Sequence, residues 1–258
     1  MRHSPLILDP AVAPRAGLPL VAVAHGSRDP RAAATVEAIL DEVRRLRPAF
    51  DVRAAYLDHS TPTLRRALHG LTEAVVLPLL LTEAYHSRVD IPAALAEITA
   101  RRPRLRVHRG ATLGPDPLLT TALERRLAEA GVPAGAPGTA VVLVSAGSSD
   151  PAANQVVARM ARAWARERPW WAVMPAYASA ASPTPAEAVT ALLEAGAPRV
   201  AVAPYLLAPG YFADKVRHDA LAAGAAVVAD VLGPAPELAD IVLTRYAQAL
   251  HARPRATA

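Results

Sequence analysis

Apolar residues follow two alternating patterns along this chain, short continuous runs and residues spaced three or four apart. The first run, Val21 to Ala24, holds small and β-branched residues, which favours a buried strand. Asp29 and Pro30 then form a favoured helix start, and apolar residues recur at helical spacing as far as Leu46. The pattern therefore predicts a strand, a glycine turn and a helix that ends before Pro48.

The same alternation continues through the rest of the first half. Pro78 interrupts a long apolar run, and because proline cannot donate to a sheet ladder, we expect it to mark a bulge or the last paired residue of its strand. Alternating strands and helices predict a four-stranded parallel sheet with helices on both faces. The further predicted strands cover 51–57, 73–81 and 105–109, and the helices cover 63–69, 90–101 and 118–130.

A Gly/Pro-rich linker follows, and then the pattern repeats. Four features recur in the same order, 119 to 126 residues later: His25 corresponds to Ala146, Tyr56 to Tyr177, Pro78 to Pro204 and Leu113 to Leu232. The sequence therefore predicts a tandem duplication, with two similar α/β lobes. We expect a loose N-terminal arm over 1–19, halves over 20–130 and 140–258, and a linker over 131–139.

The two halves differ in their polar residues. His25 is replaced by Ala146 and Asp58 by Ser179, and His86 falls against Phe212 within about a residue. His25 and His86 both follow predicted strands, and open α/β sheets bind ligands at the carboxyl ends of their strands. Each histidine alone would be read as an ordinary loop residue, but their joint loss favours one shared site in the first half and a degenerate one in the second.

The chain has 258 residues and no cysteine, which excludes disulfides, thiolate zinc sites, iron–sulfur clusters and cysteine nucleophiles. A metal ion must therefore be bound by His, Asp or Glu. Imidazole binds first-row metals through a neutral nitrogen, and its pKa near 6.5 lets it accept a proton close to neutral pH.

The net charge of +5, carried mostly by arginine, suits an anionic partner such as a nucleic acid or a polycarboxylate ligand. Aromatic residues, 4% of the chain, do not interleave with the basic ones, so we expect no nucleic acid partner. No apolar stretch reaches the length of a membrane span, and four prolines interrupt residues 1–19, so we expect no signal peptide and a cytoplasmic protein. No nucleotide-binding fingerprint is present, so no nucleotide cofactor is expected.

One combination of motifs resembles a known family. The segment Ala24-His25-Gly26-Ser27-Arg28-Asp29-Pro30, the apolar strand that leads through Pro78 to Tyr85-His86, and Asp90-Ile91-Pro92 are together similar to the sirohydrochlorin chelatases. These class II chelatases insert cobalt or ferrous iron into sirohydrochlorin, toward cobalamin or siroheme. The resemblance covers residues 20 to about 250, and it implies a chelatase fold with the site in the cleft between the halves.

The resemblance also implies roles for individual residues. The family's two metal-site histidines correspond to His25 and His86, and its acidic residue after the second strand, usually glutamate, corresponds to Asp58. Asp58 is one methylene shorter, and Glu83, three residues before His86, is a rival for its role. The family commonly has a glycine before the Tyr-His pair, where this chain has Ala84.

Metal insertion needs an ion that is held loosely and two pyrrole protons that are removed. The two histidines suit both requirements, and a carboxylate such as Asp58 can orient a histidine or pass protons on. His59 follows Asp58 directly, and we expect it to point to the opposite face, because side chains alternate along a strand.

Sirohydrochlorin carries several carboxylates, for which basic and hydrogen-bonding groups beside the histidines are candidates. Arg28 and Arg88 suit ion pairs with them, and Ser27 and the N–H groups of the Gly26 turn can add hydrogen bonds at the helix start. Tyr85, beside His86, is a further candidate for binding the substrate.

Three alternatives remain open: a ferrochelatase that acts on another porphyrin, a non-catalytic carrier of metal or tetrapyrrole, and a periplasmic-type binding module. The Ala-His-Gly-Ser motif favours the sirohydrochlorin enzyme, and the missing signal peptide argues against the binding module. We expect an ATP-independent enzyme that works as a monomer, since the fused halves already form a cleft. The sequence leaves Co²⁺ or Fe²⁺ open as the metal.

Overall fold

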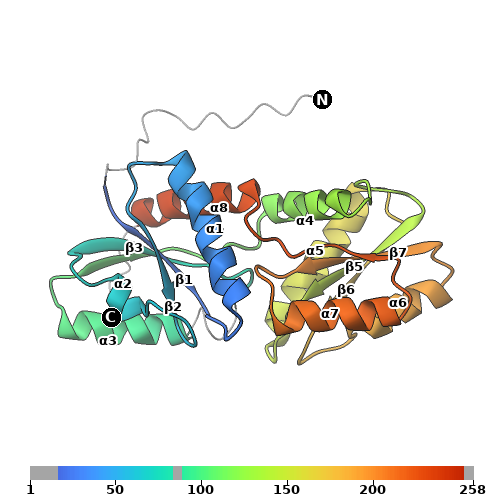
Figure 1. Cartoon of the computed structure of the whole chain (residues 1–258), viewed down its shortest axis with the longest axis horizontal. Helices are drawn as coiled ribbons and strands as arrows, with labels where there is room; N and C mark the ends of the chain where they lie inside the picture. The colour runs from blue at the N-terminus through green and yellow to red at the C-terminus, as the bar shows by residue number, and fades with distance from the viewer. Residues whose placement is uncertain (1–16, 84–88, 253–258) are drawn as a thin grey trace.

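The computed structural model describes residues 17–83 and 89–252, and two parallel sheets lie side by side in it (Figure 1). The first sheet has the strand order β2-β1-β3-β4 and the second has β6-β5-β7-β8. All pairings within both sheets are parallel, which confirms the predicted fold class of two similar four-stranded lobes. The strands are β1 (Leu20–Ala24), β2 (Val52–Tyr56), β3 (Glu73–Pro78), β4 (Arg106–Arg109), β5 (Thr139–Ser145), β6 (Ala172–Tyr177), β7 (Arg199–Tyr205) and β8 (Val227–Val228).

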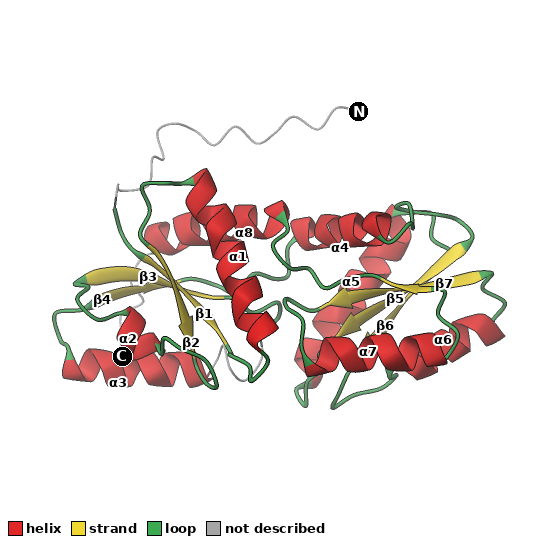
Figure 2. Cartoon of the chain, viewed as in Figure 1, coloured by secondary structure: helices red, strands yellow, loops and turns green. Residues whose placement is uncertain are grey.

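Helices cover both faces of each sheet (Figure 2). Several begin with an aspartate whose carboxylate accepts the N–H two residues on, followed by a proline that fits the first helical position; Asp29, Asp116 and Asp150 are examples. The helices are α1 (Pro30–Leu46), α2 (Leu64–Ala67), α3 (Ile91–Arg101), α4 (Pro117–Glu129), α5 (Pro151–Glu167), α6 (Pro185–Glu194), α7 (Tyr211–Ala222) and α8 (Pro236–His251).

Two elements of the first half are shorter than predicted. Strand β3 ends at Pro78, which is opposite Val23 and is the last residue paired with β1. Proline has no N–H to donate to a sheet ladder, which suits the end of a strand. Helix α2 has only four residues, because His69 N donates to Arg66 O in a tighter turn and Gly70 then takes a φ of 79°. Of the predicted N-terminal arm, only residues 17–19 are among those described.

The last helix of each half packs on the sheet of the other half (Figure 1). Helix α8 contacts α1 and β3 of the first sheet, and α4 contacts β7 of the second. Trp164 of α5 donates its indole N–H to Glu124 of α4 at 2.9 Å, and Tyr246 of α8 donates its hydroxyl to Leu18 O at 2.9 Å. The two repeats therefore exchange their final helices, and we call each sheet with the helices packed on it a lobe.

Two equivalent arginines hold the exchanged helices in place, one on each helix. Arg126 of α4 donates through Nε and Nη2 to Leu232 O at 3.0 and 2.7 Å. Arg245 of α8, 119 residues later, donates through Nε to Thr112 O at 2.9 Å and through Nη2 to Leu113 O at 3.0 Å. Leu113 and Leu232 are themselves equivalent in the repeat. These reciprocal arginines bind each helix to the chain segment that leads into the other.

The exchanged helices also join the apolar interiors of the two lobes. The sheet faces covered by α1, α4, α5 and α8 share one continuous cluster of buried apolar residues. The opposite faces, under α2 and α3 in one lobe and α6 and α7 in the other, have separate clusters. The relative position of the lobes is therefore fixed by hydrophobic burial as well as by hydrogen bonds.

Replacing Arg126 with methionine should destabilise the protein. The guanidinium is 18% exposed and supplies both hydrogen bonds to Leu232 O, so we expect a loss of about 2–3 kcal/mol of unfolding free energy. Thermal denaturation of the R126M variant should show a melting temperature lower by about 5–10 °C. Arg166→Met, at an exposed position of α5, is the control and should change it by less than about 2 °C. Equal melting temperatures for the two variants would contradict the role assigned to Arg126.

Candidate functional site

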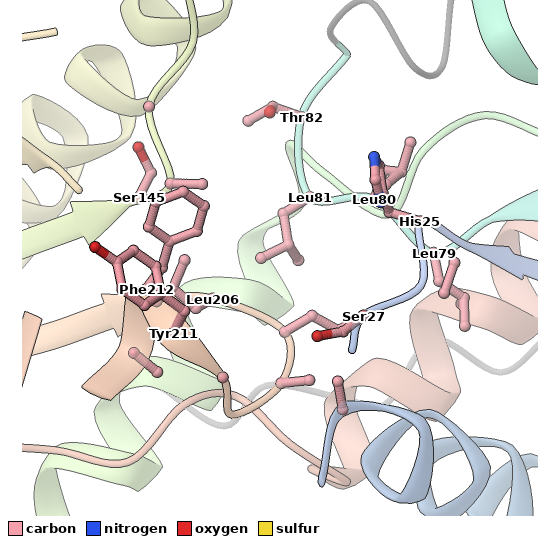
Figure 3. Close-up of a pocket in the computed structure, with 18 of the residues that line it drawn as sticks. His25, Ser27, Leu79, Leu80, Leu81, Thr82, Ser145, Leu206, Tyr211 and Phe212 are labelled. Carbon is pink, nitrogen blue, oxygen red and sulfur yellow. The ribbon is translucent and has the colours of Figure 1, made fainter. Parts of the chain in front are cut away.

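A cleft of about 920 Å³ lies between the lobes, at the carboxyl ends of β1, β3, β5 and β7 (Figure 3). Its first wall includes residues 24–28 after β1 and residues 79–82 after β3. The opposite wall includes residues 145–149 after β5 and residues 205–213 after β7. These segments follow the two central strands of each sheet, β1 and β3 or β5 and β7. From these two strands the sheet is extended in opposite directions, and open α/β sheets bind ligands at such a switch point.

Glycine is required at the start of both walls because two turns approach each other closely. Gly26 has a φ of 95°, and a Cβ added to it would lie 1.7 Å from Asp58 O. Gly147 repeats this geometry, with a φ of 83° and a Cβ position 1.9 Å from Ser179 O. The turns after β1 and β2 are thus locked together, and so are those after β5 and β6.

The serine after each glycine helps to build the helix start. Ser27 Oγ accepts the N–H of Asp29 at 3.0 Å, and Ser148 Oγ accepts that of Asp150 at the same distance. Ser27 lines the cleft as predicted, but its own N–H already donates to Ser60 Oγ at 3.2 Å. Its hydroxyl proton is the group that remains for a ligand.

His25 lines the cleft on the first wall, across from the wall that the other lobe forms (Figure 3). The side chain is half-buried, and Nδ1 lies 3.3 Å from the carbonyl oxygen of Gly26. The strand and the glycine turn therefore place one predicted metal-site imidazole in the cleft. His86, Tyr85 and Arg88, which were predicted for the same site, lie outside the described residues.

The two acidic candidates lie apart from the cleft lining. The Asp58 side chain is 63% exposed, and Asp58 N donates to His25 O at 2.9 Å, which joins the two turns through their backbones. Glu83 is exposed and also lies outside the lining. Over the described residues, neither carboxylate is therefore part of the cleft lining.

His59 lines the cleft, contrary to the expectation that it points away. Strand β2 ends at Tyr56, and His59 has a φ of 58°, so the alternation of an extended strand no longer applies to it. Asp58 binds this residue twice: Oδ1 accepts the His59 N–H at 2.7 Å, and Oδ2 lies 3.2 Å from Nε2. The repeat has Ala180 at the position of His59, with the same φ of 58°. This replacement of a histidine by alanine is the signal in the sequence that could have identified His59 as a site residue.

Two arginines of the first wall differ in their partners. Arg28 lines the cleft and is exposed, and no acidic side chain in the described ranges pairs with it. Arg31 pairs with Asp29 at 2.6 Å and, across the lobes, with Asp214 of α7 at 2.5 Å. Hydrogen bonds to Asp29 and Asp214 raise the pKa of the Arg31 guanidinium, and the bond from Arg31 lowers the pKa of Asp29.

Tyr205 connects the walls at the base of the cleft. Its hydroxyl, at the end of β7, donates to Leu81 O of the first lobe at 2.9 Å. The side chain is 2% exposed, and burial raises the pKa of Tyr205 above its ordinary value. Tyr205 therefore acts as a neutral hydrogen-bond donor between the lobes.

Two classes of feature are absent from the described ranges. Over residues 17–83 and 89–252, no three His, Asp or Glu side chains gather closely enough to hold a metal ion together. Over the same ranges, the structure contains no helix with the length and apolarity needed to span a membrane.

The fold and the cleft define a duplicated α/β protein in which one repeat supplies the polar wall of an interlobe ligand site. A family model described as CbiX matches the chain twice, over residues 19–130 and 140–249. The chain belongs to the CbiX family, which confirms the predicted membership of the class II chelatases.

Characterised relatives resemble the chain over most of its length. The sirohydrochlorin ferrochelatase of Bacillus subtilis (strain 168) is 28% identical over 202 residues, which are 76% of this chain and 77% of that protein. The sirohydrochlorin cobaltochelatase of Priestia megaterium is 29% identical over 195 residues, 73% of this chain and 63% of that one. The structure of SirB from Bacillus subtilis with Fe³⁺ superimposes with a TM-score of 0.79 at 25% identity, covering 91% of this chain and 96% of that chain.

Replacing Gly147 with alanine should destabilise the second lobe. The new Cβ would meet Ser179 O and the residue would keep a positive φ, so we expect a loss of at least about 2 kcal/mol in unfolding free energy. Gly138→Ala is the matched control, since its added Cβ meets nothing within 4 Å, and it should change stability by less than about 0.5 kcal/mol. Urea denaturation of both variants measures the difference, and equal midpoints would contradict the assigned role of the glycine.

Proposed function

We propose that this protein inserts a divalent metal ion, Co²⁺ or Fe²⁺, into sirohydrochlorin. The observation that carries the proposal is the asymmetric cleft, in which His25 and His59 stand on one wall and their repeat equivalents are Ala146 and Ala180 on the other. The relatives named as sirohydrochlorin ferrochelatase and cobaltochelatase support the same reaction. The metal ion is in this proposal a substrate, delivered to the ring and released with it.

His25, together with His86, is proposed to hold the incoming ion. Two neutral imidazoles bind a first-row metal while leaving coordination positions open for water and for pyrrole nitrogens. As the ion enters, two N–H protons must leave the ring, and a histidine can accept a proton near neutral pH. His86 stays a prediction from the sequence.

Asp58 is proposed to act through His59 rather than on the substrate. Its carboxylate contacts both the backbone N–H and the ring of His59, and it thereby fixes the direction in which that ring faces the cleft. Glu83 is exposed and is not among the residues that line the cleft over the described ranges. The contacts of Asp58 with His59 are the reason that Asp58 is proposed as the acidic partner.

The carboxylates of the substrate are proposed to bind at the first wall. Arg28 is exposed at the edge of the cleft, where a guanidinium can pair with a carboxylate in two parallel hydrogen bonds. The Ser27 hydroxyl can donate one further bond, and Arg88 and Tyr85 remain candidates from the sequence. The cleft volume of about 920 Å³ lies near the upper end of the roughly 300–1,000 Å³ that small-molecule sites occupy.

The same proposal includes the conditions under which the enzyme works. The first half supplies the metal site and the second half a degenerate one, so a single chain holds a complete cleft and a monomer suffices. Insertion proceeds without a nucleotide, a nucleic acid or a membrane, in the cytoplasm.

Replacing His25 with alanine should abolish metal insertion without unfolding the protein. We expect the rate constant at saturating sirohydrochlorin to fall about 100-fold or more, since an ion ligand and proton acceptor is removed. Anaerobic absorbance of the ring during incubation with Co²⁺ or Fe²⁺ measures the rate. His218→Ala, at an exposed position of α7 outside the cleft, is the control and should keep the original rate. Stoichiometric binding without turnover in the unmodified protein would indicate a carrier instead, and preferred turnover of another porphyrin would identify a different chelatase.

The variants Asp58→Asn and His59→Leu should each lower the insertion rate about 10-fold, the size expected for a group that orients a site residue. Because the two residues act as a unit, the double variant should be no slower than about the slower single variant. Comparing the four rate constants in a double-mutant cycle measures this coupling. Fully multiplicative losses would show that Asp58 acts independently of His59.

A further inference from the structure

Two aromatic side chains are exposed at the beginning of α7. Tyr211 is 75% exposed and Phe212 is 40% exposed. The remaining tyrosines with described side chains are buried, and the chain is only 4% aromatic. An exposed pair of this kind is unusual in such a chain and marks a surface that contacts another molecule.

The exposed pair lies in the lining of the cleft between the lobes. Both side chains are part of the cleft lining, and they project from the wall opposite His25 (Figure 3). Their rings are 5.7 Å apart and inclined at 60°, an edge-to-face arrangement in which each ring restricts the other. The cleft therefore has an imidazole on one side and an aromatic surface on the other.

The local backbone explains how two consecutive aromatic residues come to face the cleft. Gly210 precedes them with a φ of 153°, in a region that other residues rarely adopt, and no side chain caps the helix. A Cβ on Gly210 would lie 4.0 Å from the Asp29 side chain, so the turn lies directly against the start of α1. Helix α7 consequently begins at the rim of the cleft.

The repeat shows that this surface belongs to the second half alone. Pro78 and Pro204 are equivalent, and the same offset sets His86 against Phe212. The second half thus has an aromatic ring where the first half has its second predicted metal-site histidine. It has lost the groups that handle metal and protons, and it has kept a large apolar surface in their place.

The other side chains that line the cleft suit a flat apolar ligand. Leucines of the loop after β3 face the cleft from one wall, and leucines of the loop after β7 lie beside the aromatic pair on the other. Aromatic faces stack favourably on other conjugated rings, and they lose little conformational freedom in doing so. These leucines are Leu79, Leu80, Leu81, Leu206 and Leu207.

We propose that Tyr211 and Phe212 are the surface on which the face of the tetrapyrrole ring packs, so that the second half binds the ring while the first half delivers the metal. This inference rests on the proposed function and deepens it by assigning ring affinity to particular residues. The pair binds the ring in the ground state and takes no part in proton or metal transfer.

The Tyr211→Ala/Phe212→Ala variant tests the proposal. Titration with metal-free sirohydrochlorin under anaerobic conditions, followed by the shift of the ring's absorption band, gives the dissociation constant. We expect it to rise about 10- to 100-fold, from the loss of two stacked rings. The KM for the ring should rise by a similar factor, while kcat should stay within about threefold, because no reacting group is removed.

Leu221→Ala is the matched control, an exposed apolar residue of the same helix that lies outside the cleft lining, and its dissociation constant should not change. A conservative Tyr211→Phe variant should keep the ring affinity of the unmodified protein. Both aromatic residues are exposed, so the double variant should also keep the original melting temperature.

The outcomes separate this inference from the proposed function. If the unmodified protein neither binds nor metallates sirohydrochlorin, the proposed function fails. If it does both and the double alanine variant binds the ring with unchanged affinity, the proposed function stands and the aromatic surface is overturned. A double variant that binds the ring normally but loses self-association in sedimentation would assign the pair to a contact between two copies of the chain.

Discussion

The exchange of the final helices between the two repeats is the constraint on which the rest of the structure depends. In each lobe the final helix of the other repeat completes the cover of one sheet face. Helix α4 covers the second sheet and α8 the first, and a single apolar cluster extends through both lobes. Because Arg126 and Arg245 bind the carbonyl groups of the opposite crossover segments, each exchange is fixed at a defined register. The cleft therefore has two walls whose separation is set by the core.

The duplication separates residues that build the scaffold from those that carry the chemistry. Gly26 and Gly147 are both required by a close backbone approach, so neither half can replace its glycine without strain. Ser27 and Ser148 both accept the N–H of a capping aspartate, so they too are retained. Such constraints do not apply to the histidines that line the cleft, and there the halves have diverged, with Ala146 in place of His25 and Ala180 in place of His59.

Much of the fold could be predicted from local patterns, since the order of strands and helices follows directly from hydrophobic spacing and capping residues. The expectation that Pro78 could be the last paired residue of its strand is confirmed. The exchange of α4 and α8 could not be predicted, since an amphipathic helix presents the same apolar face to either sheet. His25 lines the cleft because the end of its strand positions it there, and this position follows from the strand pattern. His59 was missed because its orientation depends on a positive φ that no strand pattern reveals.

The exchanged helices have a consequence for the integrity of the covalent chain. The segment over 131–138 joins two elements that are already held together by burial and by the reciprocal arginines. A chain cleaved there would remain associated as two interlocked fragments, each completing the other's interior. Conversely, either fragment produced alone would lack the helix that closes its sheet, and it would be prone to pair with a second copy of itself. The single chain is therefore organised like a dimer in which two similar subunits exchange a helix.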